Sequence, residues 1–574
     1  MLKTVLLHSL EKVFPDSAFV DNTHVAFSAM RNEPLSLQVA YRIEDEPPKT
    51  VPIYATVEAD IPITMYAEGY VPLMMGVDDT PFTERYTAGL FADPLLPKQA
   101  KPEIGHVDCP HVHEYAEVGE DTVLRASTAG WQALWLTVNE DGEPIPAGEY
   151  TVSVKFYCKW NNAHMGTATT TVKIVNAQLP EQRLYNTNWV HADMIARTYG
   201  VEIFSDRFFE IFENHIRPAG KHGMNMILLP AFTPALDTPM GTERFPAQLV
   251  SVTLKDGEYT FDFALVKRYI DICRKCNIPY FEHCHFFSQW GAECAPNIYA
   301  TVDGEHKRIF GWDTSSTSPE YCKFLRAYIT EFKKFMDKED LHGKVLFHIS
   351  DEPHGDQIIN YRAAKAQIID LLKDEMMGDA LSEFSFYEDG TVQIPIVSTG
   401  HIHTFLGKCD NLWCYYTAYA GYNDKEEVRM KASNRLINNS SERNRILGVQ
   451  MYYHHIKGFL HWGYNYYSTT LTQGFFNPLI NPEMFQGNPG HSYFIYPNPD
   501  GTCLQSIRQK VFFEGILDVR ALELLESLVG REQTVALIEQ HYGKVTFATE
   551  AESGDRLLTF RNAVNDAIAA AVQK

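Results

Sequence analysis

The chain has 574 residues, of which 45% are hydrophobic and 21% are charged, which is the composition of a folded globular protein with two or three domains. Its 50 Lys and Arg against 73 Asp and Glu give a net charge of −23, which repels nucleic acid phosphates and anionic lipid headgroups. We therefore expect neither nucleic acid nor a membrane as a partner, and the composition is compatible with a homo-oligomer.

No stretch approaches the roughly 20 apolar residues of a membrane-spanning helix, and residues 1–12 lack the long apolar core and cleavage site of a signal peptide. Ten cysteines are scattered without paired spacing, as is typical of reduced cytosolic thiols. The one C-x-x-C pair, Cys273 and Cys276, lies in a helical pattern and predicts two buried small side chains rather than a metal or redox site. We expect a soluble, cytoplasmic protein.

Short strands separated by Pro, Gly and Asp turns run through the first third of the chain. The clearest of them cover residues 35–42, 133–138, 148–157 and 170–175. This pattern predicts a β-sandwich over residues 1–178. The polar, proline-containing residues 176–183 that follow predict a domain boundary.

Apolar strands and amphipathic helices alternate through the rest of the chain. After a first strand ending near Asn188, the predicted strands are 224–230, 278–285, 344–350, 394–398, 411–416 and 458–463. The predicted helices between them are 205–221, 262–276, 319–338, 358–375 and 443–456. Seven or eight such units predict a (β/α)8 TIM-like barrel over residues 179–574, with C-terminal closing helices near 503–530, 533–541 and 556–571.

Polar and aromatic residues follow nearly every predicted barrel strand, where a barrel places its reacting groups. Aromatic rings stack on the apolar faces of a sugar while polar groups bind its hydroxyls, so the pattern predicts a sugar site. The alternative is a tyrosine-rich core. The candidate substrate-binding residues are His191, Asp193, His283, His285, Gln289, Trp290, Trp312, Tyr415, Tyr416, Trp462, Tyr464 and Asn465.

Asp351 and Glu352, followed by Pro353, are the predicted catalytic pair, because two carboxylates directly follow a strand that should be buried. Neighbouring side chains in a strand face opposite ways, so both acids can meet one ligand only if the backbone turns, and Pro353 favours such a turn. The alternative is a surface turn or helix cap.

Adjacent carboxylates cannot easily straddle a scissile glycosidic bond as acid and direct nucleophile. They suit a substrate-assisted reaction, in which the sugar's own 2-acetamido oxygen attacks the anomeric carbon. One carboxylate then orients the acetamido nitrogen and its neighbour supplies acid and base.

The acid pair and four stretches, at residues 222–234, 443–450, 458–465 and 513–520, resemble glycoside hydrolase family 123 and its relatives carrying domain of unknown function 4091. The resemblance covers most of the chain. It implies a β-sandwich followed by a barrel and a retaining exo-β-N-acetylgalactosaminidase, with other N-acetylhexosamines as second candidates. It also implies that Asp351 orients and polarises the acetamido group and that Glu352 is the general acid and then the general base.

Two other functions stay open on the sequence. His283 and His285 could share a strand face and, with His191, His401 and His461, hold a catalytic metal, although metal hydrolases of this kind place the pair on the first barrel strand rather than the third. A non-catalytic glycan-binding protein is the second alternative. Nucleotide-binding and esterase motifs are absent from the sequence, so we expect no cofactor and no resident metal.

Overall fold

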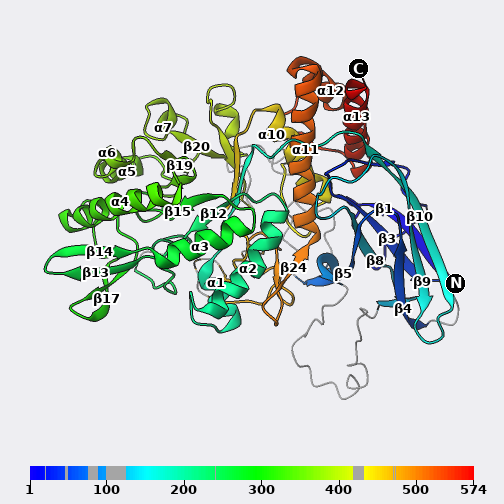
Figure 1. Cartoon of the computed structure of the whole chain (residues 1–574), viewed down its shortest axis with the longest axis horizontal. Helices are drawn as coiled ribbons and strands as arrows, with labels where there is room; N and C mark the ends of the chain where they lie inside the picture. The colour runs from blue at the N-terminus through cyan, green and yellow to red at the C-terminus, as the bar shows by residue number, and fades with distance from the viewer. Residues whose placement is uncertain are drawn as a thin grey trace.

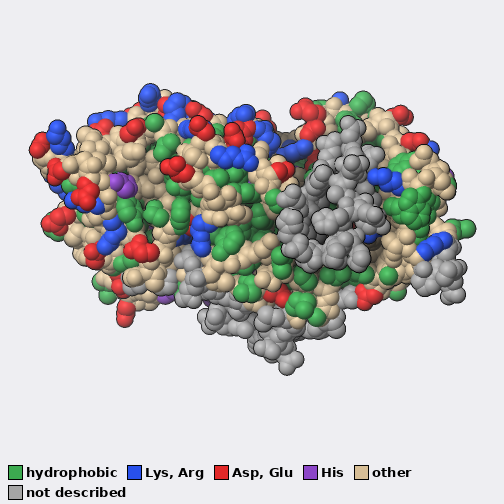
Figure 2. All heavy atoms as spheres, turned by 90° about the horizontal axis from the view of Figure 1, so that it is seen from below, with side chains coloured by type: hydrophobic (Ala, Val, Ile, Leu, Met, Phe, Trp, Pro, Cys, Tyr) green, Lys and Arg blue, Asp and Glu red, His purple; other side chains and the backbone are tan. Residues whose placement is uncertain are grey.

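The computed structural model describes residues 1–19, 21–44, 49–74, 88–97, 124–238, 241–417, 432–469, 471, 474–485 and 487–573. These residues form an N-terminal region rich in β-sheet and a C-terminal region built on a closed barrel of eight parallel strands (Figure 1). On the face shown in Figure 2, acidic and basic side chains are interspersed over the described surface.

The N-terminal region contains two sheets. The larger has the order β1-β3-β8-β5-β6-β24-β23 and the smaller has the order β2-β10-β9-β4-β7. Side chains of both sheets, among them Val39 of β3 and Val154 of β9, form one buried hydrophobic cluster. The ten strands from this part of the chain are β1 (Leu2–His8), β2 (Phe27–Met30), β3 (Leu35–Ile43), β4 (Thr50–Glu58), β5 (Ile63–Leu73), β6 (Gly89–Pro97), β7 (Leu124–Ser127), β8 (Gln132–Val138), β9 (Gly148–Cys158) and β10 (His164–Val175).

The larger sheet also takes strands from the far end of the chain. β23 (Tyr496–Pro497) pairs with β24 (Cys503–Ser506), and β24 pairs with β6, placing Gln505 opposite Leu95. One sheet therefore joins segments about 400 residues apart, and the division of the chain at residue 178 stays a prediction.

The eight barrel strands are all parallel to their neighbours, and β22 closes the barrel against β11. Each of the seven strands expected from the sequence is present, with shorter bounds for most. The strands are β11 (Tyr185–Asn188), β12 (Met226–Leu229), β15 (Tyr280–His283), β18 (Val345–Phe347), β19 (Met376–Leu381), β20 (Ile394–Ser398), β21 (Trp413–Tyr415) and β22 (Gly458–His461).

β19 is the barrel strand that the sequence did not reveal. Its residues include Gly378 and Asp379, which are both depleted from strands in general. A side chain at position 378 would lie about 2.9 Å from the carbonyl oxygen of Ile394, so the glycine permits the close approach of β20.

Helices lie between most barrel strands, as the alternating pattern predicted. Ser205 and Ser318 accept hydrogen bonds from the first turns of α2 and α4, which accounts for where these two helices begin. The helices are α1 (Ala192–Tyr199), α2 (Asp206–Lys221), α3 (Ala264–Lys275), α4 (Pro319–Glu339), α5 (Gln357–Ala366), α6 (Ile369–Leu372), α7 (Ser385–Glu388), α9 (Ser441–Arg445) and α10 (Leu447–Tyr453), with one 3-10 turn, η2 (Ile402–Thr404).

Two hairpins extend the loops that follow β12 and β15. They are β13 (Ser251–Lys255) with β14 (Glu258–Asp262), and β16 (Ile298–Val302) with β17 (Glu305–Phe310), and together they form a four-stranded sheet. This sheet lies at the end of the molecule away from the N-terminal sheets (Figure 1).

Three C-terminal helices follow: α11 (Ile507–Val529), α12 (Arg531–Tyr542) and α13 (Gly554–Val572). In Figure 1, α11 stands between the barrel and the N-terminal sheets, and it packs on α9 and α10 as well as on β6 and β24. Within the residues that the structure describes, no helix is both long enough and apolar enough to cross a membrane.

Nine cysteines lie in the described residues and all are free thiols. Cys273 and Cys276 are buried, as the sequence predicted. Cys109 lies outside the described residues.

Candidate active site

The acid pair lies just beyond the end of β18, at the carboxyl-terminal mouth of the barrel. Both Asp351 and Glu352 are partly exposed, while Pro353 is buried. Glu352 has a φ of 44°, so the backbone turns at the pair as the sequence predicted. A non-glycine residue in this region is uncommon and costs about 1 kcal/mol or more, and such residues cluster at functional sites.

A second strained residue supports this turn. Trp290, with a φ of 57°, donates its backbone N–H to the carbonyl oxygen of Asp351 at 2.8 Å. The Trp290 side chain is 44% exposed. The loop after β15 therefore supports the turn that carries the acids, and its Trp290 is an exposed aromatic residue.

The two carboxylates have different surroundings. The hydroxyl of Tyr415, at the end of β21, donates a hydrogen bond to Glu352 Oε1. Burial raises the pKa of Asp351 well above its ordinary value, and the Glu352 carboxylate raises this pKa further. The nearby His348 lowers the same pKa, but by less.

A buried network of charged groups lies beneath the pair. His348 lies 3.0 Å from Glu282 Oε2 through Nε2 and 3.2 Å from Asp379 Oδ1 through Nδ1. Burial opposes a charge on His348, but the hydrogen bonds to Asp379 and Glu282 outweigh burial and raise its pKa to about 10. The imidazole is therefore a cation at neutral pH.

Both acids of this network have further donors. Glu282 accepts hydrogen bonds from Trp189 Nε1 at 3.0 Å and from the hydroxyl of Thr187. Asp379 accepts from the backbone N–H of Ile349 and from the hydroxyl of Tyr361.

The sequence prediction did not select His348, Glu282 or Asp379 as site residues. Asp379 lies on the missed strand β19. Glu282 carried a usable signal, because an acid in the middle of a buried barrel strand is rare unless it is paired.

The prediction for His283 is wrong. Its side chain is buried on the helix side of β15, where Nε2 lies 2.7 Å from the hydroxyl of Tyr328 on α4 and Nδ1 lies 2.6 Å from the carbonyl oxygen of Cys284. His285 lies elsewhere, stacked on His348 with ring centroids 4.6 Å apart. The two histidines therefore do not form a pair that could hold one metal ion.

Among the described residues, His285, His348 and Asp379 have ligand atoms close enough together to hold a metal ion. Both ring nitrogens of His348 are already donated to carboxylates, and both oxygens of Asp379 accept hydrogen bonds. The chemistry of this donor set fits a charged hydrogen-bond network better than a metal site.

His191 and Asp193 form a second buried network around Arg244, which lies in the loop after β12. Arg244 makes two hydrogen bonds with Asp193, at 2.8 and 3.0 Å, and one with His191 Nδ1 at 3.0 Å. Asn465 bonds to the backbone of His191 through both ends of its amide. The three predicted residues are buried and connect the loops after β11 and β22, and their contact with substrate stays a prediction.

Tyr416 and Tyr464, two further predicted substrate-binding residues, are also fully buried. Tyr464 donates its hydroxyl to the carbonyl oxygen of His215 on α2. Tyr416 packs against Phe459 and His461 in the interior. Their burial favours the alternative of an aromatic core for these two tyrosines.

Four other predicted residues lie in loops after the barrel strands. Trp462 is half-buried and packs against Phe485. Trp312 is half-buried and donates its indole N–H to the carbonyl oxygen of Thr242 at 2.7 Å. Gln289 accepts from the backbone N–H of Asp237, and its buried amide nitrogen has no partner in the described part of the chain. With Trp290, these residues remain candidates for contact with a ligand.

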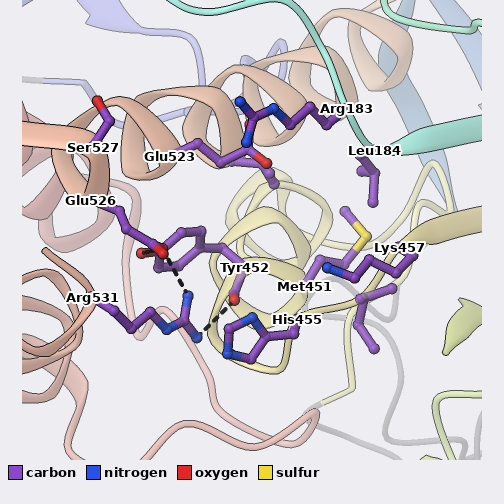
Figure 3. Close-up of a pocket in the computed structure, with 12 residues that line it drawn as sticks. Arg183, Leu184, Met451, Tyr452, His455, Lys457, Glu523, Glu526, Ser527 and Arg531 are labelled. Carbon is purple, nitrogen blue, oxygen red and sulfur yellow. Dashed lines mark hydrogen bonds and ion pairs between the residues drawn. The ribbon is translucent and has the colours of Figure 1, made fainter. Parts of the chain in front are cut away.

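A cavity of about 410 Å³ lies at the other end of the barrel (Figure 3). It is lined by Arg183 and Lys457, which precede β11 and β22, and by residues of α10 and α11. Because barrels place their chemistry at the carboxyl-terminal mouth, this cavity is not the candidate active site.

The sequence model of the glycoside hydrolase family 123 catalytic domain matches residues 189–525. No curated protein matches the chain significantly in sequence. Among solved structures, a family 123 glycoside hydrolase from Clostridium perfringens, analysed for the details of glycolipid glycan hydrolysis, is similar with a TM-score of 0.71. It is 13% identical in sequence, and the alignment covers 100% of this chain and 99% of that one, so the two share a fold.

Two β-glucuronidases have looser similarity. The one from Ruminococcus gnavus has a TM-score of 0.30 at 8% identity, covering 86% of this chain and 67% of its own. The one from Bacteroides uniformis has a TM-score of 0.28 at 8% identity, covering 88% and 49%. These scores are too low to support an argument. The family match spans more than half of the chain and includes the acid pair, and the protein belongs to glycoside hydrolase family 123.

Proposed function

We propose that the protein is a retaining exo-glycosidase that removes terminal β-linked N-acetylgalactosamine by a substrate-assisted mechanism. The observation that carries the proposal is the adjacent pair Asp351 and Glu352 on a strained turn at the mouth of the barrel. Adjacent carboxylates can both face one sugar ring, but they are poorly placed to lie on opposite sides of its scissile bond.

In the first step, the acetamido carbonyl oxygen of the substrate attacks the anomeric carbon as the glycosidic bond breaks. Glu352 gives its proton to the departing oxygen, and Asp351 accepts a hydrogen bond from the acetamido N–H. The product is a cyclic oxazolinium ion, whose positive charge the Asp351 carboxylate stabilises.

In the second step, Glu352 takes a proton from a water molecule as the water oxygen bonds to the anomeric carbon. The bond to the acetamido oxygen breaks and the free sugar leaves. Two inversions at the same carbon give overall retention. The proposal uses no cofactor.

The surroundings of the pair suit these roles. Partial burial disfavours a charge on Asp351. Two interactions with the substrate compensate for this cost: the hydrogen bond from the acetamido N–H and the positive charge of the oxazolinium ion. Tyr415 fixes the rotamer of Glu352 by its hydrogen bond. Trp290, whose backbone bonds to Asp351, is an exposed aromatic residue, which suits stacking on a sugar ring.

The family and the site both support the proposed substrate class. A family 123 relative is described for glycolipid glycan hydrolysis, which supports a glycan with a terminal sugar as the substrate here. Other N-acetylhexosamines share the acetamido group, so β-linked N-acetylglucosamine is the second candidate substrate.

The test compares chromogenic β-N-acetylgalactosaminide, β-N-acetylglucosaminide and β-galactoside at equal concentrations. We expect hydrolysis of the first, weaker or no hydrolysis of the second, and none of the third, which lacks the acetamido group. Equal turnover of the galactoside would contradict the substrate-assisted mechanism.

A glycan-binding protein without activity is the alternative, and Glu352→Gln separates the two. We expect this variant to lose hydrolysis while still binding the free sugar. If the wild type binds the sugar but hydrolyses none of the three substrates, the binding function is favoured instead.

A further inference from the structure

The segment from His348 to Asp351 is held at every residue. The backbone carbonyl oxygens of His348, Ile349 and Asp351 accept hydrogen bonds from the β15 loop, at 3.2 Å from Phe286, 3.1 Å from Phe287 and 2.8 Å from Trp290. The hydroxyl of Ser350 donates to the carbonyl oxygen of Ser288 at 2.7 Å. The turn that carries the acids is thus fixed to the neighbouring loop along its length.

His348 and Asp379 fix the other side of the same segment. Asp379, on β19, accepts hydrogen bonds from the His348 side chain and from the backbone N–H of Ile349, the latter at 3.1 and 3.2 Å. Glu282, on β15, forms a hydrogen bond with Nε2 of His348, the ring nitrogen opposite Asp379. One imidazole therefore ties the strands on both sides of β18 to the residues that lead into the acid pair.

We propose that His348, held as a cation by Glu282 and Asp379, is a positioning residue that fixes the Asp351–Glu352 turn. Its positive charge also favours the ionised form of Asp351. The inference rests on the proposed function for its catalytic meaning, but the ionisation of His348 can be tested without activity.

The geometry suits a cation. Two buried carboxylates bond to opposite nitrogens of one ring, and a neutral imidazole has only one N–H to donate. Both carboxylates have neutral donors as well, so the imidazolium matters as the counter-charge of two buried negative groups. The pKa of His348, raised to about 10, agrees with this arrangement.

Several titratable groups face His348 from the elements packed around it. His285 stacks on its ring, and its buried Nδ1 has no partner within the described residues. Burial lowers the pKa of His285 and of His283, and the positive charge of His348 lowers both further, so both rings are neutral. The groups that face the network are Glu282, Asp379, His285, Tyr361, Asp351 and Glu352, and His283 lies within reach of its charge from the helix side of β15.

The charges of His348 and Asp379 act on Asp351 in opposite directions: the cation lowers its pKa and the carboxylate raises it. Activity at low pH requires Asp351 to be ionised, so the acid limb of the kcat/KM profile reports this balance. We expect His348→Gln to move the acid limb to higher pH by about one unit, because it removes the charge that lowers the Asp351 pKa.

Tyr361→Phe is the matched control, because it removes a hydrogen bond to Asp379 without changing any charge. We expect its acid limb to stay where it is in the wild type, even if its kcat falls. An unshifted acid limb in His348→Gln would overturn the proposal, since a purely structural role moves the rate and not the profile.

Nuclear magnetic resonance of the 15N-histidine-labelled wild type tests the cation directly and needs neither a variant nor a substrate. Of the 22 histidines, ordinary ones are neutral at pH 8.5, whereas His348 should still show an imidazolium signal. Its absence would overturn this inference alone. An imidazolium signal in a protein that fails to hydrolyse any acetamido sugar would instead support the network and reject the proposed function.

Discussion

Tyr415 and Glu352 show how one contact links two barrel strands at the candidate site. Tyr415 lies at the end of β21 and Glu352 beyond the end of β18, and the tyrosine hydroxyl donates to the carboxylate. A hydrogen bond to a charged group contributes about 1.5–3 kcal/mol and, here, it also fixes the direction of the acid.

We expect Tyr415→Phe to lower kcat/KM for the acetamido substrate by roughly tenfold or more, because about 1.4 kcal/mol corresponds to a factor of ten in rate. Steady-state kinetics on the aryl glycoside measure this. The matched control is Tyr452→Phe, which removes a tyrosine–glutamate bond of the same kind, to Glu526, beside the cavity at the opposite end of the barrel (Figure 3). A tenfold loss of kcat/KM in Tyr452→Phe as well would contradict a specific role of Tyr415 at the site.

At the scale of elements, α13 is attached to the N-terminal region by buried charge pairs. Arg561 lies 2.6 Å from Glu33 and 2.9 Å from Asp518 of α11, and all three side chains are at most 7% exposed. Arg445 of α9 bonds to the same Asp518. Removing one member of such a group leaves an uncompensated buried charge.

We expect Arg561→Met to destabilise the protein by about 3 kcal/mol, seen as a lower midpoint of thermal unfolding. Lys173→Met is the control, because Lys173 pairs with Asp566 of α13 at the same junction but both side chains are about half exposed or more. An exposed pair contributes about 1 kcal/mol at most. If both variants shift the midpoint equally, burial is not what makes the Arg561 pairs important.

At the scale of the whole molecule, α11 carries charges that bind the N-terminal sheets to the barrel. Lys510 pairs with Glu140 just after β8, and Tyr66 of β5 donates to the same carboxylate at 2.7 Å. Burial alone would raise the pKa of Glu140, but Lys510 and Tyr66 outweigh burial and lower it to about 2. At Lys510 burial prevails and lowers the pKa to about 8.

This pair predicts how stability depends on acid. Because folded Glu140 has a lower pKa than unfolded Glu140, its contribution is fully present above about pH 4.5 and is lost as the pH falls toward 2. We expect the difference in thermal midpoint between wild type and Glu140→Gln to shrink over this range. Glu143→Gln, at an exposed residue nearby, should follow the wild type at every pH. A constant difference for Glu140→Gln would contradict the account.

The sequence predicted those strands and helices whose positions are set by a hydrophobic pattern. β20 was placed at residues 394–398, where the structure has it, because its apolar run is bounded on both sides. β19 was missed because it contains Gly378 and Asp379, which are unusual in strands. Gly378 permits close packing against β20 and Asp379 binds His348, and both are tertiary contacts that the local sequence does not reveal. The hairpins after β12 and β15 were also missed, although Val252, Ile298 and Ala300 give each a buried side and an Asp-Gly pair forms each turn.

The site was predicted unevenly for a related reason. Residues after strand ends could be found from the sequence, but the side of the strand on which each lies could not. His283 faces the helices, whereas Asp351 and Glu352 are partly exposed beyond β18. Arg244 was missed because its partners Asp193 and His191 lie about 50 residues away in sequence.

The claim that the acetamido group of the substrate is the nucleophile is tested most directly by weakening that nucleophile. Aryl β-galactosaminides carrying acetyl, fluoroacetyl, difluoroacetyl and trifluoroacetyl groups on the same nitrogen differ mainly in the electron density of the carbonyl oxygen. The account predicts that kcat/KM falls steeply with each added fluorine. A rate that does not change along the series would contradict it.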